Sequence, residues 1–254
     1  MNRFGVISDI HGNMHAMQAV MARLTKMNVD QILCLGDIVG YGPFPDACLD
    51  MVVKHCKVIV QGNHDQAVVD PVVADEFNGA AREAIYWTRD ALGPLHLNAL
   101  NRLRKTALVG QKILCVHDNP AQNRMDYVHD AEMAAISFRG MDRHICLIGH
   151  THVPVVFEAP SLNPDEQLTA PEVVTYSPQD GKPITLDPER RYICNPGSVG
   201  QPRDSDPRAS FAVLDLNEQT FTVFREMYDI EAAQMATQRA GLPFVLAERL
   251  ALGA

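Results

Sequence analysis

The chain has 254 residues, and its 22 Lys and Arg against 31 Asp and Glu give a formal net charge of −9. A chain of this length can bury a full hydrophobic core without disulfides or a structural metal. Its acidic balance makes it a poor candidate for a general nucleic-acid binder or for a protein that binds anionic membranes. The composition, 46% apolar and 21% charged, is typical of a folded globular protein and excludes a disordered one.

The lack of targeting signals and the pattern of cysteines both favour the cytoplasm. Every apolar run falls far short of the roughly 20 residues of a membrane-spanning helix, and residues 1–10 lack the apolar stretch of a secretory signal. Cys34, Cys115, Cys146 and Cys194 each lie in a short apolar run, and no C-x-x-C pair occurs. We therefore expect a cytoplasmic protein with reduced, buried cysteines that have no zinc or redox role.

The first half of the chain alternates strands with helices. Strands are expected at 4–8, 32–35 and 58–61, and helices at 13–27 and 47–55. This order predicts parallel strands joined by right-handed crossovers. A longer helix at 77–92 is expected to end near Gly93-Pro94, a combination that terminates helices.

The second half is richer in strands. Two hairpins are expected, one pairing 106–109 with 112–116 and one pairing 210–216 with 220–226. A helix is expected at 131–138, and Asp229 is expected to cap a closing helix. The remaining strands are expected at 145–148, 153–157, 173–177, 184–186 and 192–194. We predict an α/β (α+β) fold in one domain, 1–254, with two sheets face to face and helices outside. Within it, 159–188 is expected to be a surface excursion and 229–254 a C-terminal helical segment.

Polar residues that can bind metals follow five of the expected strands. They are Asp9 and His11, then Asp37, then Asn63 with His64, then His117, and finally His150 and His152. The carboxyl ends of strands form the ligand-binding edge of open α/β sheets, so we expect these side chains to meet. Imidazole together with carboxylate suits Mn, Fe, Co, Ni or Zn better than Ca or Mg.

The number of these residues indicates two metal ions. Without His64, seven side chains remain, which exceeds the usual ligand number of one ion. Two ions that share a bridging carboxylate would use them all, and Asp37 is the natural bridge because its loop contributes no other ligand. Two metals roughly 3.5–4 Å apart are a recurring device for activating water and holding a phosphoryl group.

At these residues the sequence resembles the calcineurin-like metallophosphoesterases. The family pattern D-x-H, G-D, G-N-H-[DE], H, G-H-x-H is matched by 9–11, 36–37, 62–65, 117 and 149–152. The resemblance covers about 4–204 and implies a four-layer fold of two sheets between outer helices. It implies one metal held by Asp9, His11, Asp37 and His152, and a second held by Asp37, Asn63, His117 and His150. It also implies that His64 is a catalytic residue, a general acid that binds no metal.

The second motif separates branches of this family. Ser/Thr protein phosphatases carry G-D-x-x-D-R-G, whereas Gly40 and Tyr41 occupy the acidic and arginine positions here. The chain resembles instead small bacterial phosphoesterases with G-D-x-x-G-Y-G-P and an N-P-G-S-V-G segment, which lies at 195–200. The backbone of that Gly- and Pro-rich segment is expected to approach a ligand closely. The expected substrate contacts are Asn63, His64, Tyr41 and Arg203, although Arg203 has an alternative role as an ion-pair partner of Asp204 or Asp206.

The resulting functional hypothesis is hydrolysis of a phosphodiester by a hydroxide bound to two divalent transition metals. Mn is the first expectation for the metal, with Fe, Ni, Co or Zn as alternatives. A phosphomonoesterase, a nucleotide pyrophosphatase and a non-catalytic scaffold of the same fold are the alternative functions. The expected partner is a small phosphoester, nucleotides included, and neither a membrane nor nucleic acid in general. Loops 41–45, 125–129 and 159–188 are expected to select the substrate, while the oligomeric state and the role of Asp118 stay open.

Overall fold

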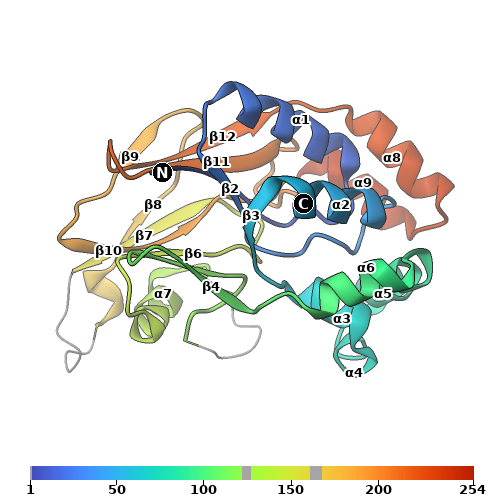
Figure 1. Ribbon diagram of the computed structural model, residues 1–254, viewed down its shortest axis with the longest axis horizontal. Coiled ribbons are helices and arrows are strands. Elements are labelled where there is room, and N and C mark those ends of the chain that lie inside the picture. The colour runs from blue at the N-terminus through green and yellow to red at the C-terminus, as the bar shows by residue number, and fades with distance from the viewer. Residues whose placement is uncertain (1, 122–126, 161–167) are drawn as a thin grey trace.

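The computed structural model describes residues 2–121, 127–160 and 168–254, whose strands form two six-stranded sheets packed face to face (Figure 1). The first sheet has the order β3-β2-β1-β11-β12-β9. β1, β2 and β3 are parallel, and the other three strands add to them in antiparallel fashion. The strands of this sheet are β1 (Arg3–Ile7), β2 (Gln31–Cys34), β3 (Cys56–Ile59), β9 (Pro183–Thr185), β11 (Ala209–Asp215) and β12 (Thr220–Glu226).

The second sheet has the order β4-β5-β6-β10-β7-β8 and is also mixed. β5, β6 and β10 run parallel at its centre, and antiparallel pairs flank them. Its strands are β4 (Thr106–Val109), β5 (Ile113–Val116), β6 (Ile145–Leu147), β7 (Val155–Pro160), β8 (Val174–Tyr176) and β10 (Arg190–Asn195). The expected parallel strands of the first half and both expected hairpins are thereby confirmed.

Helices cover the outer faces of both sheets. The helices are α1 (Met14–Lys26), α2 (Pro45–His55), α3 (Asn63–Val69), α4 (Pro71–Ala74), α5 (Gly79–Ala91), α6 (Pro94–Asn101), α7 (Ala131–Ser137), α8 (Ile230–Arg239) and α9 (Phe244–Leu252), with 3-10 turns η1 (Phe138–Gly140) and η2 (Ala170–Glu172). Figure 1 shows α3–α6 and the C-terminal α8 and α9 at the same end of the sandwich. Within the described ranges, every helix is too short or too polar to cross a lipid bilayer.

The core consists of three apolar layers and a smaller cluster, formed by Ala84, Leu242 and Leu246, where α5 meets the C-terminal helices. Residues such as Val6, Leu33 and Leu147 fill the space between the sheets. The buried face of α1, including Met17, packs on the outer side of the first sheet, because its apolar residues recur at helical spacing. α7 covers the second sheet. The order helix, sheet, sheet, helix confirms the predicted two-sheet, four-layer fold, and the six cysteines are free, five of them buried.

Some predicted elements require correction. Gly93 ends α5 as expected, but Pro94 then begins α6, since a proline at the first helical position loses no hydrogen bond. The single closing helix is wrong as well: α8 ends before Gly241, which has a φ of +74°, and α9 follows. Within 159–188, the described strands β8 and β9 form edges of two different sheets, while 161–167 lie outside the described residues.

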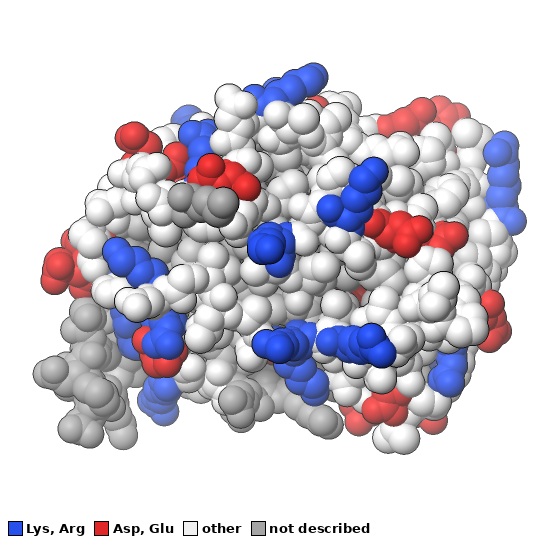
Figure 2. Space-filling model, in the orientation of Figure 1, with Lys and Arg blue, Asp and Glu red and all other residues white. Residues whose placement is uncertain are grey.

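The distribution of charge is even on the face drawn in Figure 2. Acidic and basic side chains are interspersed there among uncharged residues, and no broad surface of one sign is seen on that face. On this face the mixed charge leaves no extended basic surface of the kind that binds the nucleic-acid backbone. The predicted metal-binding residues lie instead at the carboxyl ends of the strands.

Candidate metal centre

The residues predicted to bind metal meet at one edge shared by both sheets. They follow β1, β2 and β3 in the first sheet and β5 and β6 in the second. Two groups form in which all donor atoms lie within 4.8 Å of one another: Asp9, His11, Asp37 and His152, and then Asp37, His117 and His150. All six residues are buried. Among the described residues, Asp37 alone belongs to both groups, which is the arrangement expected of a bridging carboxylate.

The distances show how closely the donors converge. Asp37 Oδ2 lies 3.6 Å from His11 Nε2 and 3.3 Å from His117 Nε2. His152 Nε2 lies 3.1 Å from His11 Nε2 and 3.4 Å from Asp9 Oδ1. The amide oxygen of Asn63, Oδ1, lies 3.1 Å from His117 Nε2, so Asn63 lies beside the second group, as expected of the seventh predicted ligand.

The histidines are oriented through their second ring nitrogens. The Nδ1 atoms of His11, His117 and His152 lie 3.2, 2.7 and 2.5 Å from the backbone oxygens of Val39, Leu35 and Gln201. Such a contact requires a proton on Nδ1, which leaves the lone pair of Nε2 directed at the neighbouring donors. Metal-ligating histidines are held in this way. The buried Nε2 of His150 has no hydrogen-bond partner among the described residues. These observations fit a site for divalent cations.

The backbone is strained where it presents these ligands. Asp9, His11, Asp37, His150 and His152 have φ values from +50° to +69°, in the left-handed region that residues other than glycine rarely adopt. Such conformations cost about 1–3 kcal/mol each and persist where surrounding structure holds them, most often at functional sites. Here the N–H groups of Asp9 and His11 donate to the carbonyls of Gly36 and Asp37, which ties the loop after β1 to the loop after β2.

Burial disfavours the charged forms of both kinds of ligand. It raises the pKa of Asp9 to about 7 and lowers the pKa of His150 to about 3. Burial would also raise the pKa of Asp37, but the charge of His117 and that of His64 hold it well below its usual value. For His117 burial is outweighed by Asp37, and the pKa rises to about 10. A bound cation favours charged carboxylates and neutral imidazoles, and so would oppose the effect of burial on Asp9 and the protonation of His117.

Asp65, the acidic residue of the G-N-H-[DE] motif, fastens two ligand loops together. Its Oδ1 accepts hydrogen bonds from the N–H groups of Ile38 and Val39, and its Oδ2 accepts one from Gly62. The side chain is fully buried. A Cβ on Gly62 would lie 2.0 Å from Asp37 Oδ1, so only glycine allows this approach. Asp65 thereby positions Asp37 and Asn63 without belonging to either metal group.

Asp65→Asn is expected to lower the free energy of unfolding by about 1–3 kcal/mol, because the new amide nitrogen leaves at least one buried N–H donor unpaired. Urea unfolding of the metal-depleted protein measures this loss. The matched control is Asp90→Asn, an exposed carboxylate on α5, which is expected to change stability by less than about 0.5 kcal/mol. Equal stability of Asp65→Asn and wild type would contradict the proposed role of the three hydrogen bonds.

The N-P-G-S-V-G segment supports the ligand loops from behind. Asn195 Nδ2 donates to the carbonyl of Gly149 at 2.7 Å, and Ser198 Oγ donates to the carbonyl of Asp9 at 2.8 Å. A Cβ on Gly200 would lie 1.8 Å from the carbonyl oxygen of Ile10. This backbone closely approaches the chain's own loops, a contact for which glycine is needed, while its expected approach to a ligand stays a prediction.

A cavity of about 480 Å³ opens beside the metal groups. All four expected substrate contacts line it, namely Asn63, His64, Tyr41 and Arg203. His64 is buried, belongs to neither metal group, and lies with its ring centroid 4.4 Å from that of Tyr41. The alternative ion pairs of Arg203 are not formed, since Asp204 pairs with Arg225 and Asp206 with Arg208. Arg203 Nη2 instead donates to Gln201 Oε1 at 2.9 Å.

The cavity wall also contains residues that the sequence did not reveal. Phe77 lies against His64 with ring centroids 4.9 Å apart, and Tyr127 stacks on His150 with centroids 4.3 Å apart. Leu246 and Arg249 reach the cavity from α9. Of these residues, Tyr127 lies in loop 125–129, one of the three loops expected to select the substrate, and residues 125 and 126 of that loop lie outside the described ranges.

Asp118, whose role was open, lines a different and smaller pocket. This pocket, of about 60 Å³, includes Lys105, Gln66 and Glu76, and it touches the larger cavity at Asn63. Asp118 belongs to neither of the metal groups found among the described residues. Burial raises the pKa of its carboxyl group, and the charge of His117 acts in the opposite direction.

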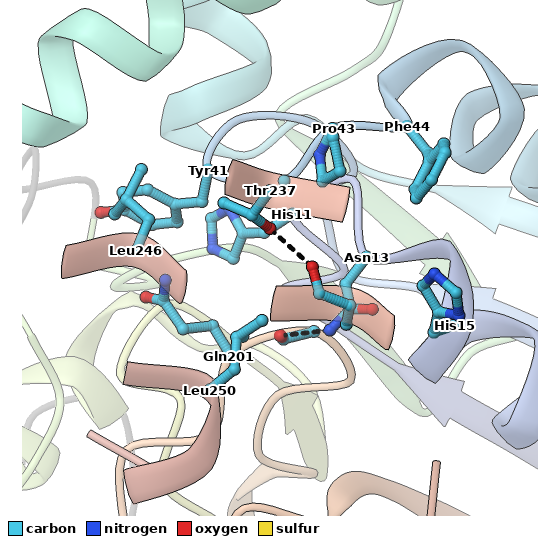
Figure 3. Close-up of a pocket in the computed structure, with 13 residues that line it drawn as sticks. His11, Asn13, His15, Tyr41, Pro43, Phe44, Gln201, Thr237, Leu246 and Leu250 are labelled. Carbon is cyan, nitrogen blue, oxygen red and sulfur yellow. Dashed lines mark hydrogen bonds between the residues drawn. The ribbon is translucent and has the colours of Figure 1, made fainter. Parts of the chain in front are cut away.

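The C-terminal helices close the back of the site. Figure 3 shows Thr237 of α8 with Leu246 and Leu250 of α9 facing the loops that carry His11 and Tyr41. The small pocket between them holds little free space, about 10 Å³, so the packing is tight. The helical segment expected at 229–254 thus forms a wall of the centre.

Two mixed sheets with paired Asp/His groups at their common edge define a metallophosphoesterase. The family model for the calcineurin-like phosphoesterase superfamily domain matches residues 2–219, and the chain belongs to this family. An uncharacterized protein from Methanocaldococcus jannaschii is 34% identical over 257 residues, covering 98% of this chain and 97% of that protein.

Solved structures agree with this assignment. A metallophosphoesterase from Sphaerobacter thermophilus is 38% identical, with a TM-score of 0.85 over 100% of this chain and 99% of that one. A hypothetical protein from Pyrococcus horikoshii is 18% identical and has a TM-score of 0.74 over 100% of this chain and 99% of its own. The latter likeness shows the fold alone.

Proposed function

We propose that this protein hydrolyses a phosphodiester with two divalent transition metals, Mn being the first candidate. The observation that carries the proposal is the pair of donor groups that share Asp37, with three imidazoles oriented by backbone carbonyls. A purely structural role would not require five ligand residues in left-handed conformations beside an open cavity. The strained ligand residues and the open cavity therefore favour an enzyme over a scaffold of the same fold.

The donor sets assign residues to two ions. One ion would be held by Asp9, His11, Asp37 and His152, and the other by Asp37, Asn63, His117 and His150. When bound, the ions would supply a Lewis acid and a water of lowered pKa. The buried carboxylates and the carbonyl-bonded imidazoles provide the fixed donors for them, so little reorganisation is needed.

The remaining residues of the cavity act on the substrate. Arg203 presents its guanidinium to the cavity and can donate hydrogen bonds to a phosphate oxygen. Burial lowers the pKa of His64 to about 4, so its imidazole is neutral at neutral pH and serves as an N–H donor to the leaving oxygen. Phe77 and Tyr127 contribute apolar walls that hold the organic part of the ester and limit access of water.

We expect purified active protein to contain about two transition-metal ions per chain, because the donors exceed what one ion takes. Elemental analysis gives the stoichiometry, and turnover with Mn is measured on an aryl diester, an aryl monoester and a nucleotide panel. Chelation should abolish turnover and lower the Tm, since ligands that bind only the folded state stabilise it. At most one ion per chain in active protein would refute the dinuclear site.

The same panel separates the alternative activities. Preference for the aryl monoester identifies a phosphomonoesterase, and cleavage confined to nucleotide anhydrides identifies a pyrophosphatase. Two bound metals without turnover of any of these compounds would contradict the proposed hydrolysis. The panel therefore tests the reaction separately from the metal site.

A further inference from the structure

The wall of the cavity that is formed by α9 carries a second arginine. Arg249, from the last turn of α9, lines the cavity together with Arg203. Its Nε donates to an oxygen of Ala254, the C-terminal residue, at 2.6 Å, and neither terminal nitrogen has a hydrogen bond among the contacts of the described residues. Arg249 is only partly exposed, so its side chain is held at the cavity instead of extending into solvent.

The two guanidinium groups lack Asp and Glu partners. Within the described ranges, no Asp or Glu side chain forms an ion pair with Arg203 or Arg249, and the nearby Asp204 and Asp206 pair with Arg225 and Arg208 instead. Burial and the charge of Arg203 both lower the pKa of Arg249, as expected for like charges near each other. Two arginines in one cavity, with terminal N–H groups that bond to no Asp or Glu, suit an anion with more charge than a single phosphodiester carries.

Two acidic side chains also line the cavity. Asp37 belongs to the metal groups, and Glu76, from the connection between α4 and α5, forms no ion pair with either arginine among the described residues. The cavity volume of about 480 Å³ falls in the range of roughly 300–1,000 Å³ that accommodates an organic ligand and not merely a phosphate ion. There is room for a substrate with a second anionic group.

We propose that Arg249, beside Arg203, binds a second phosphate of the substrate, so that preferred substrates carry one phosphate besides the one that is cleaved. This inference rests on the proposed phosphoester hydrolysis and specifies its substrate class. Arginine suits this task because its planar fork of N–H groups matches phosphate oxygens. The position of Arg249 on a helix that is itself packed behind the metal centre fixes its distance from the cleaved phosphorus.

The test compares ligands that differ by one phosphate. Isothermal titration calorimetry of the Mn-loaded protein gives the Kd of AMP, ADP and adenosine 3′,5′-bisphosphate at constant free Mn. Wild type is expected to bind ADP, adenosine 3′,5′-bisphosphate or both about 10- to 100-fold more tightly than AMP. This is the gain in affinity that one hydrogen-bonded charged pair typically gives. Arg249→Gln is expected to lose most of this ratio, and Arg249→Lys to keep part of it.

Arg239→Gln, an exposed arginine at the end of α8, is the matched control and should keep the wild-type ratio. If wild type binds all three compounds equally, or if Arg249→Gln keeps the ratio, the inference is wrong. A lowered Tm with equal weakening of all three ligands would show that Arg249 only supports the helix end, and it would also overturn the inference. Turnover of the aryl diester, measured alongside, reports separately whether the hydrolysis itself has failed.

Discussion

His64→Asn is expected to reduce kcat on a phosphodiester by about 10²- to 10³-fold, the usual contribution of one oriented hydrogen-bond donor to an oxygen on which negative charge develops. The loss should fall on kcat more than on KM, because charge on the leaving oxygen develops only as the P–O bond breaks. Both metals should be retained, since His64 belongs to neither donor group. An ester that releases nitrophenolate should suffer less than one that releases an alkoxide, which needs the N–H donor more.

Steady-state kinetics on the two esters and elemental analysis of the variant measure these effects. His55→Asn, an exposed histidine on α2, serves as the control and should leave both kcat and metal content unchanged. Loss of a metal from His64→Asn would reassign His64 as a ligand. Equal losses with both leaving groups would exclude its role at the leaving oxygen.

Asp37→Asn is expected to empty both metal positions, whereas His11→Ala should empty one first. Asp37 Oδ2 faces His11 Nε2 on one side and His117 Nε2 on the other, so the loss of its charge weakens both groups. Loss of the metals should reduce kcat/KM by on the order of 10³-fold or more, since metal ions contribute several kcal/mol to transition-state stabilisation. Metal content and activity are measured together across a titration with Mn.

The control for this comparison is Asp118→Asn, which removes a carboxylate next to His117 but outside both groups. It should retain about two ions per chain. Identical metal occupancy in Asp37→Asn and His11→Ala at every Mn concentration would contradict the bridging position of Asp37.

The location of the centre could be predicted because sequence order and sheet geometry determine it together. Asp9, Asp37 and His117 each come directly after an apolar run, and the ends of parallel strands must meet at one edge. Gly36, beside Asp37, marked one of the tight turns. The left-handed backbone at Asp9 and Asp37 could not be predicted, since Asp in such a conformation has no local marker of the kind that glycine provides.

The cavity wall could not be predicted for a different reason. Arg249 and Leu246 lie more than 40 positions after Arg203, on a helix whose own pattern fixes only which side is apolar. The face of α9 that reaches the cavity is determined by packing of the helix against α5 and the loop of Tyr41. Such tertiary contacts cannot be read from the pattern of one helix. Similarly, Pro94 can end one helix or begin the next, and only packing of α6 against α3 decides between these outcomes.

The two donor groups have a mechanical consequence, because each takes ligands from both sheets. His152 and His117 follow strands of the second sheet, whereas the carboxylates with which they converge follow strands of the first. Ions bound there would cross-link the halves of the sandwich at the edge where the apolar layer between them ends. Any motion that separates the sheets at this edge would then have to break coordination bonds, and release of the ions would in turn loosen the core.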